Sequence, residues 1–214
     1  GLAAAIHLAS AGWPVELHEA RSAVGSRFDG DHQILPSFGE GPSGPELMQR
    51  LGLEQAQTQP LRRARFLDGT GRRSQAVSAE PYALLIRRGP GPGTLDSALA
   101  ARAADLGVTV RTGSRLEAEA ADIVATGAPT VDGAALELLF RTGAPDRIDV
   151  LFDEALTPGG YAYLFIDAGE ATLGVAALSG YKLLRPMLQA AQDRFHAVEP
   201  FDVREPRQSG NLMN

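Results

Sequence analysis

The sequence predicts an α/β protein whose second half is an antiparallel β-sheet. Three observations lead to this prediction. Residues 1–20, GLAAAIHLASAGWPVELHEA, read as a helix, a turn and a strand. Residues 82–111 repeat the order strand, helix, strand. Beyond Gly127, short alternating segments separated by glycine-containing turns replace this rhythm, which is typical of an antiparallel sheet.

The opening helix and strand form the second half of a βαβ unit. Apolar residues recur at helical spacing from Leu2 to Ala9, and Gly12 ends the helix. Residues 15–19 then alternate apolar and polar up to Glu19. We expect the first strand and most of a glycine-rich turn to precede Gly1, which stands where a dinucleotide-binding fingerprint has its third glycine. Glu19 lies 18 residues further on, near the spacing of a ribose-binding acid. An ordinary amphipathic helix before a strand is the alternative.

Composition narrows the class of function. The 214 residues are enough for one or two domains, and 44% apolar with 21% charged residues is ordinary for a globular protein. The net charge of −6 argues against nucleic acid as a main partner. The chain has no cysteine, and its four histidines are scattered, so we expect no disulfide and no metal site. No catalytic acid, base or nucleophile stands out, and no apolar run is long enough for a transmembrane helix.

The middle of the chain predicts the remaining α/β elements. Residues 29–42 are loop-rich, a short helix is expected over residues 46–51, and residues 64–73 suggest a hairpin. Thr94 is a candidate N-cap for a helix over residues 95–106. The segments YALLIRR, VTVRT and ADIVATG (residues 121–127) are predicted strands. Arginines around the hairpin could bind an anion, although a solvated face is favoured: Arg62, Arg63, Arg65, Arg72 and Arg73.

The second half predicts four antiparallel strands and one helix. The strands are ALELLFRT, RIDVLFD, GYAYLFID and ATLGVAAL, and the amphipathic helix covers residues 182–198. Within the third strand, Tyr161, Tyr163 and Phe165 have the i, i+2, i+4 spacing that places all three on one face.

Residues 15–28, VELHEARSAVGSRF, resemble the second-strand motif V-x-h-h-E-x-x-x-x-h-G-G-R of flavoproteins with two dinucleotide-binding domains. Ser26 stands where the motif has its second glycine. The resemblance implies that Glu19 accepts hydrogen bonds from the hydroxyls of an adenosine ribose, that Gly25 lets the chain pass close to the cofactor, and that Arg27 lies near the pyrophosphate. A solvated surface charge is the alternative role for Arg27.

The order of the following elements resembles the FAD domain of the same flavoproteins. On that resemblance, Arg88 or its neighbour Arg87 contacts FAD, the segment Arg115–Leu116 faces the adenine, and Gly127 closes the sheet beside the dinucleotide. The cofactor-binding residues implied are therefore Gly1, Glu19, Arg27, Arg88, Leu116 and Gly127.

Residues 158–166, PGGYAYLFI, resemble the P-x-x-Y-x-W-x-F-P motif of the geranylgeranyl reductase branch, with Tyr163 in place of Trp and Ile166 in place of Pro. The chain is thereby identified as a member of the FAD-dependent oxidoreductases that include geranylgeranyl reductase-like and aromatic hydroxylase-like proteins. The resemblance implies a Rossmann-like FAD-binding domain without its first strand (residues 1–35 and 82–128) and an antiparallel β-sheet substrate domain (residues 36–81 and 129–214). Tyr161, Tyr163 and Phe165 would line the substrate pocket, with ordinary core packing as the alternative.

Three functional hypotheses follow from this resemblance. The first is a reductase or dehydrogenase of an apolar, isoprenoid-type substrate, in which the flavin carries the hydride and NAD(P)H is the electron donor. The second is a FAD monooxygenase of the aromatic hydroxylase type. The third is a non-functional truncated product. We expect a cytoplasmic prokaryotic protein, with peripheral membrane association through a lipophilic substrate left open. We also expect the 214 residues to be an inactive fragment that lacks both ends of the enzyme.

Overall fold

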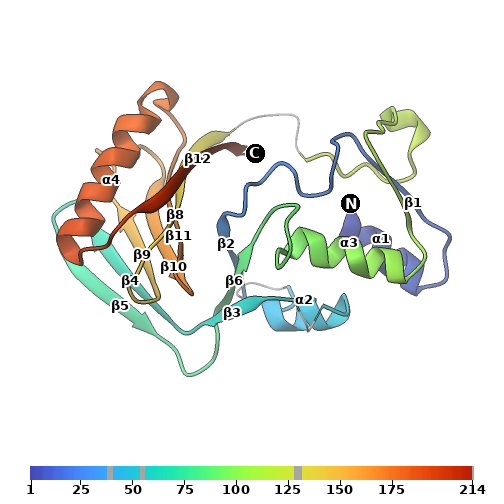
Figure 1. Cartoon of the computed structure of the whole chain (residues 1–214), viewed down its shortest axis with the longest axis horizontal. Helices are drawn as coiled ribbons and strands as arrows, with labels where there is room; N and C mark the ends of the chain where they lie inside the picture. Colours follow the sequence, from blue (N-terminus) through green and yellow to red (C-terminus); the bar gives the residue numbers. More distant parts are fainter. Residues whose placement is uncertain (38–40, 54–55, 128–131, 214) are drawn as a thin grey trace. The chain divides into compact units, whose positions relative to one another are not determined.

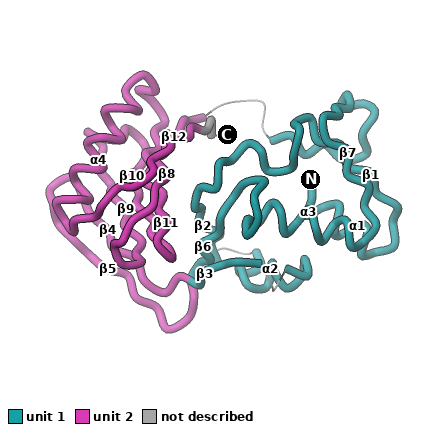
Figure 2. Tube along the Cα trace, viewed as in Figure 1, with its two compact units in different colours: residues 1–60, 82–127 teal, residues 61–81, 128–214 magenta. Residues whose placement is uncertain are grey.

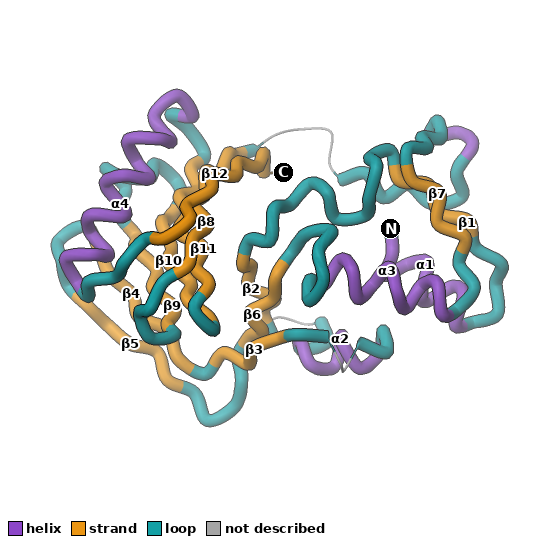
Figure 3. The backbone as a smooth tube through the Cα atoms, viewed as in Figure 1, coloured by secondary structure: helices purple, strands orange, loops and turns teal. Residues whose placement is uncertain are grey.

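The computed structural model describes residues 1–37, 41–53, 56–127 and 132–213. The chain divides into two compact units: unit 1 contains residues 1–60 and 82–127, and unit 2 contains residues 61–81 and 128–214 (Figure 2). Unit 1 mixes helices and strands, whereas unit 2 consists mainly of strands (Figure 3). This change in character agrees with the α/β fold and antiparallel sheet that the sequence predicts.

Unit 1 contains the α/β elements (Figure 1). They are α1 (Leu2–Ser10), β1 (Glu16–Glu19), β2 (His32–Pro36), α2 (Gly44–Arg50), β3 (Thr58–Leu61), β6 (Ala83–Arg87), α3 (Leu95–Asp105), β7 (Thr109–Thr112) and the 3-10 turn η1 (Ala118–Ala120). Strand β3 crosses the boundary between the units, since its last residue belongs to unit 2. Strands β1 and β7 form a parallel pair, and β2, β6 and β3 form a second sheet in that order.

Helix α3 begins at the cap that the sequence predicts, and α2 begins two residues before the expected residue 46. The Thr94 hydroxyl accepts a hydrogen bond from the Ser97 N–H at 3.2 Å and so caps α3. Ser43 and Glu46 form a reciprocal capping box at the start of α2. Helix α1 buries Ala5 and Ile6 in the core of unit 1, as its apolar spacing predicts. Gly12, which follows the C-cap residue Ala11 of α1, has φ +87°. Glycine adopts this backbone conformation without strain.

Unit 2 is a seven-stranded sheet with one long helix. Its elements are β4 (Arg63–Asp68), β5 (Arg73–Val77), β8 (Gly133–Arg141), β9 (Arg147–Phe152), β10 (Tyr161–Asp167), β11 (Glu170–Ala177), the turn η2 (Tyr181–Leu183), α4 (Leu184–Val198) and β12 (Arg204–Met213). The strand order is β12-β8-β11-β10-β9-β4-β5. All neighbouring strands are antiparallel except β4 and β9. The four strands, the hairpin and the helix expected from the sequence are all present.

Helix α4 supplies the second layer of unit 2. Met187, Leu188, Ala191 and Phe195 of the helix belong to one buried cluster. The strand residues in that cluster alternate along the sequence, for example Leu164 and its second neighbours Ala162 and Ile166 on β10. Because successive strand residues point to opposite faces, the odd-numbered residues of β10 lie on the face away from α4.

An ion-pair network joins β4, β9 and the end of α4 within unit 2. The Arg65 guanidinium donates to both oxygens of Asp149, at 2.5 and 2.7 Å, and to the Glu199 carboxylate at 2.5 Å. Arg147 donates to Asp149 as well, at 3.1 Å. Asp149 is fully buried, so its charge is compensated by two arginines. The hairpin arginine Arg65 is thus part of the unit's internal packing rather than a solvated charge.

The structure differs from the sequence prediction in three respects. Residues 121–127 form no strand, and Ile123 and Val124 are more than half exposed. A strand needs a hydrogen-bonded neighbour, and among the described residues β1 pairs only with β7. Strands β2, β3 and β12 were not expected, because their hydrogen-bonding partners are distant in sequence.

The third difference concerns residues 36–60, which the sequence assigned to the second domain. In the structure they belong to the compact unit 1. Pro36 ends a strand that pairs with β6, and Met48, Leu51 and Leu53 share a buried cluster with Leu84 of β6.

Within the described parts of the chain, none of the helices is long and apolar enough to cross a membrane.

Candidate functional site

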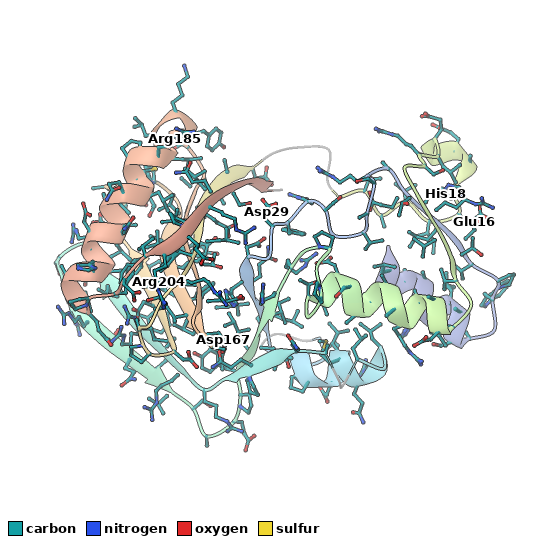
Figure 4. The ribbon with its side chains drawn as sticks, viewed as in Figure 1. Glu16, His18, Asp29, Asp167, Arg185 and Arg204 are labelled. Atoms are coloured by element: carbon teal, nitrogen blue, oxygen red, sulfur yellow. The ribbon has the colours of Figure 1, made fainter. Side chains whose placement is uncertain are left out.

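The carboxyl ends of the parallel strands β1 and β7 bring Glu19 and the segment 114–116 together. The Ser114 N–H donates to the Glu19 carbonyl at 3.0 Å, and the Ser114 hydroxyl lies 2.8 Å from Nδ1 of His18. Figure 4 shows His18 beside Glu16 on this strand. The Glu19 carboxylate accepts a hydrogen bond from the Arg21 N–H at 2.8 Å. Ligands of open α/β sheets bind outside such carboxyl ends, and half-buried Glu19 retains acceptor capacity there.

Gly1 and the segment leading to Gly127 lie beside the same strand. A Cβ atom built on Gly1 would lie 3.6 Å from Cδ1 of Leu17 and 3.9 Å from Cβ of Ala125. These are ordinary contacts, so the position tolerates glycine or alanine, as the third fingerprint position does. Gly127 follows two residues later with φ +85°. The structure therefore brings Gly1 and Ser114 next to β1, whose last residue is Glu19. Gly127 and half-exposed Leu116 each follow two residues after a neighbour of this strand.

Arg27 and Arg88 share one aromatic ring. Their guanidinium carbons lie 5.7 and 4.2 Å from the centre of the Phe28 ring. Arg88 also forms a two-point ion pair with Asp96, at 2.8 and 3.0 Å, and donates to Gln33 at 3.2 Å. These contacts fix Arg88 and balance much of its charge. The side chain of Arg27 is exposed. Of the two neighbours considered from sequence, Arg88 is the one that lies with Arg27.

Gly25 allows the two loops of this cluster to touch. Its φ is +74°, and a Cβ atom there would lie 2.6 Å from Cβ of Asp96 and 2.8 Å from the Gly89 carbonyl oxygen. The sequence motif attributed this glycine to close passage of a cofactor. In the structure, the close neighbours are the loop after β6 and the first turn of α3.

The donor and acceptor set of unit 1 fits a dinucleotide such as FAD. Glu19 offers a carboxylate at a strand end, which suits ribose hydroxyls. Arg27 offers an exposed guanidinium, which suits a phosphate. The role of each of these residues toward FAD stays a prediction.

A row of aromatic rings lies on the face of the unit 2 sheet that points away from α4. Tyr161 and Tyr163 have ring centres 5.8 Å apart, and Tyr163 stacks on Phe165 at 4.8 Å. Phe152 lies 6.2 Å from Tyr161 and 6.3 Å from Phe66, which extends the row onto β4. The row runs from exposed to buried: Phe152 is 52% and Tyr161 43% exposed, whereas Tyr163 and Phe165 are buried. The one-face arrangement predicted from spacing is therefore present, with its open end at Tyr161.

Glu137 is a residue of this face that the sequence analysis missed. Its buried carboxylate accepts a hydrogen bond from the Tyr163 hydroxyl. Burial, together with the charge of Glu137, raises the pKa of Tyr161 above its usual value. No sequence signal marked Glu137, because its partner lies 26 residues away and two strands across the sheet. Among the described residues, no group of three or more histidine, aspartate or glutamate side chains could hold a metal ion.

Comparison with known proteins supports a flavoprotein assignment. A geranylgeranyl bacteriochlorophyll reductase-like protein from Thermoplasma acidophilum has a similar fold, with a TM-score of 0.65 and 16% identity over 99% of this chain and 63% of the other. A 2-methyl-3-hydroxypyridine-5-carboxylic acid oxygenase has a TM-score of 0.60 and 19% sequence identity, and the match covers 99% of this chain and 68% of the other. The flavin-dependent halogenase CmlS has a TM-score of 0.64 and 15% sequence identity, and the match covers 99% of this chain and 48% of the halogenase.

These similarities establish the fold, and this chain spans about three fifths of the length of the reductase-like protein. No curated protein matches the sequence significantly. The family profile described as flavin-containing amine oxidoreductase matches residues 1–184, which is most of the chain, and a flavin family agrees with the FAD cofactor expected from sequence. The chain therefore belongs to the flavin-containing amine oxidoreductase family.

Proposed function

We propose that the full-length protein is a FAD-dependent reductase or dehydrogenase of an apolar, isoprenoid-type substrate. Unit 1 binds the dinucleotide and the aromatic face of unit 2 contacts the substrate. NAD(P)H supplies the electrons. The family assignment supports the flavin chemistry, whereas the substrate and the electron donor belong to the proposal.

The observation that carries this proposal is the aromatic row on the face away from α4. Five rings on three strands form a continuous row of ring contacts: Phe66, Phe152, Tyr161, Tyr163 and Phe165. Ligand sites are lined mainly by such side chains, with few polar groups to fix orientation. Tyr161 and Phe152 are the accessible members, and they would contact the substrate first.

The residues of unit 1 have binding roles in this proposal. Glu19 holds the ribose hydroxyls, and Arg27 neutralises part of the pyrophosphate charge. Arg88, fixed by Asp96 and Phe28, orients the loop that follows β6. Bound FAD supplies the hydride transfer, so the protein needs no acid or base of its own for that step.

A FAD monooxygenase of an aromatic substrate is the second candidate. The tilted rings of Phe152 and Tyr161 at the open end of the row favour it, because a planar aromatic substrate could pack edge-to-face against them. The two candidates differ in the consumption of oxygen. The third hypothesis from the sequence, a product without function, predicts that the protein binds no flavin.

The test combines flavin content with two rate measurements on the full-length protein. On this proposal the purified protein carries FAD, and geranylgeraniol or a related polyprenyl compound accelerates NAD(P)H oxidation under anaerobic conditions. Oxygen uptake coupled to a phenolic substrate would instead support the monooxygenase. A protein without flavin contradicts both. Co-sedimentation with liposomes tests the peripheral membrane association that a lipophilic substrate suggests.

A further inference from the structure

Glu137 and Tyr163 belong to one row of residues that crosses the sheet of unit 2. In this row Tyr163 of β10 lies opposite Gly174 of β11, Gly174 opposite Glu137 of β8, and Glu137 opposite Ser209 of β12. Residues opposite each other in a ladder point to the same face. Glu137 therefore lies on the aromatic face, two strands from Tyr163.

Gly174 makes the contact between these two strands possible. A Cβ atom at residue 174 would lie 2.7 Å from Cε2 of Tyr163 and closer still to the hydroxyl end of the ring. Without a side chain at this position, the ring lies across β11 and its hydroxyl reaches the Glu137 carboxylate. On its other side the ring stacks on Phe165, so its position is fixed from two directions.

The charge of Glu137 reaches the exposed end of the row. Tyr163, whose hydroxyl donates to Glu137, has its ring centre 5.8 Å from that of Tyr161, so Tyr161 is the next ring along the row from the carboxylate. Burial and, secondly, the charge of Glu137 raise the pKa of Tyr161, which agrees with this arrangement. The intervening groups are aromatic, and a charge in such surroundings is screened less than a charge in water. A ligand group that lies against the Tyr161 ring is therefore exposed to the same negative potential.

We propose that Glu137, held by Tyr163 over Gly174, is a specificity-determining residue that selects a substrate whose polar end carries hydrogen-bond donors or a positive charge. Carboxylates and phosphates are rejected by the same carboxylate. A donor-bearing or cationic group is attracted to it, and the accessible ring of Tyr161 favours a cation as well. This inference rests on the proposed role of the aromatic face in substrate binding and narrows its substrate class to apolar molecules without an anionic end.

The test uses two probes of the same shape and opposite charge, benzamidine and benzoate. Calorimetric titration of the full-length protein should give an affinity for benzamidine that is about tenfold or more above that for benzoate, since 1.4 kcal/mol of discrimination corresponds to a factor of ten. In Glu137→Gln the ratio should fall toward one. The matched control is Asp193→Asn, which removes one charge from the exposed side of α4 and should leave the ratio unchanged.

Tyr163→Phe separates charge from packing. It keeps the carboxylate and the ring but removes the hydroxyl, so the preference for benzamidine should persist. Equal affinities for the two probes in the wild-type protein, or the absence of binding by both, would overturn the proposal even if Glu137→Gln fails to fold. FAD content is measured in the same samples. A protein with FAD but without discrimination refutes this inference alone, whereas a protein without FAD refutes the proposed function.

Discussion

Gly174 leaves the space on β11 that the ring of Tyr163 fills, since a Cβ atom at residue 174 would lie 2.7 Å from Cε2 of that ring. Gly174→Ala should therefore displace a ring that also stacks on Phe165 and donates to Glu137. We expect the free energy of unfolding to fall by about 1–3 kcal/mol, the usual effect of an added methyl group in a packed site. Urea unfolding of the full-length protein measures this change.

A second variant shows whether the ring is the cause. In a Tyr163→Ala background the space is empty, so Gly174→Ala should be neutral or stabilising by about 0.5 kcal/mol, because alanine restricts the unfolded chain. A coupling energy near zero between the two substitutions would mean that the predicted clash does not determine the stability of this site.

The sequence predicted the elements whose signals are local. The spacing from Leu2 to Ala9, the cap at Thr94 and the alternation around Tyr161 each specify a helix or a strand within a few residues. Three other features depend on distant partners. Strand β12 forms because β8 is available, residues 121–127 form no strand for lack of a neighbour, and the Glu137–Tyr163 contact requires a glycine on the strand between them.

Tyr161 and Tyr163 should respond differently to truncation. Tyr161 is 43% exposed, so Tyr161→Ala should change substrate turnover in the full-length enzyme and move the melting temperature little. Tyr163 is buried, and Tyr163→Ala should lower the free energy of unfolding by about 3–5 kcal/mol, as expected for a core aromatic ring. A large fall in melting temperature for Tyr161→Ala, with turnover per folded molecule intact, would leave the row as core packing.

The buried ion-pair network should contribute more to stability than an exposed pair. Asp149→Ala leaves Arg65 and Arg147 without their shared carboxylate. We expect the free energy of unfolding to fall by about 3–5 kcal/mol. The control is Glu16→Ala, which removes the exposed contacts of Glu16 with Arg111 and His18 and should lower the free energy of unfolding much less, because solvent screens exposed pairs. Similar losses for the two variants, measured by urea unfolding, would contradict this ranking.

His32 should make the stability of the protein depend on pH in the acid range. Burial, helped by the charge of Arg87, lowers the pKa of His32 from 6.5 to about 4. The unfolded chain therefore binds a proton between these values that the folded chain does not, and stability falls as the pH decreases through this window. The contribution of neutral, buried His32 to the free energy of unfolding is fully present above pH 6.5. As the pH falls to about 4, the loss of this contribution can reach about 3 kcal/mol, at about 1.4 kcal/mol per pKa unit. Urea unfolding at several pH values measures the free energy of unfolding as a function of pH. In His32→Gln this free energy should change less steeply with pH between 4 and 6.5 than in the wild-type protein. An unchanged pH dependence would assign the effect to other groups.

The affinity of the full-length protein for FAD tests the central claim most directly. Glu19 ends β1 at the carboxyl edge of a parallel pair, and its carboxylate should make one or two charge-assisted hydrogen bonds to ribose hydroxyls, each worth about 1.5–3 kcal/mol. Titration of the apoprotein, followed by flavin fluorescence, should show affinity reduced about tenfold or more in Glu19→Ala. The same substitution at Glu16, three residues earlier on the strand, should leave it unchanged. Absence of FAD binding by the wild-type protein, or equal affinity in Glu19→Ala, would contradict the account.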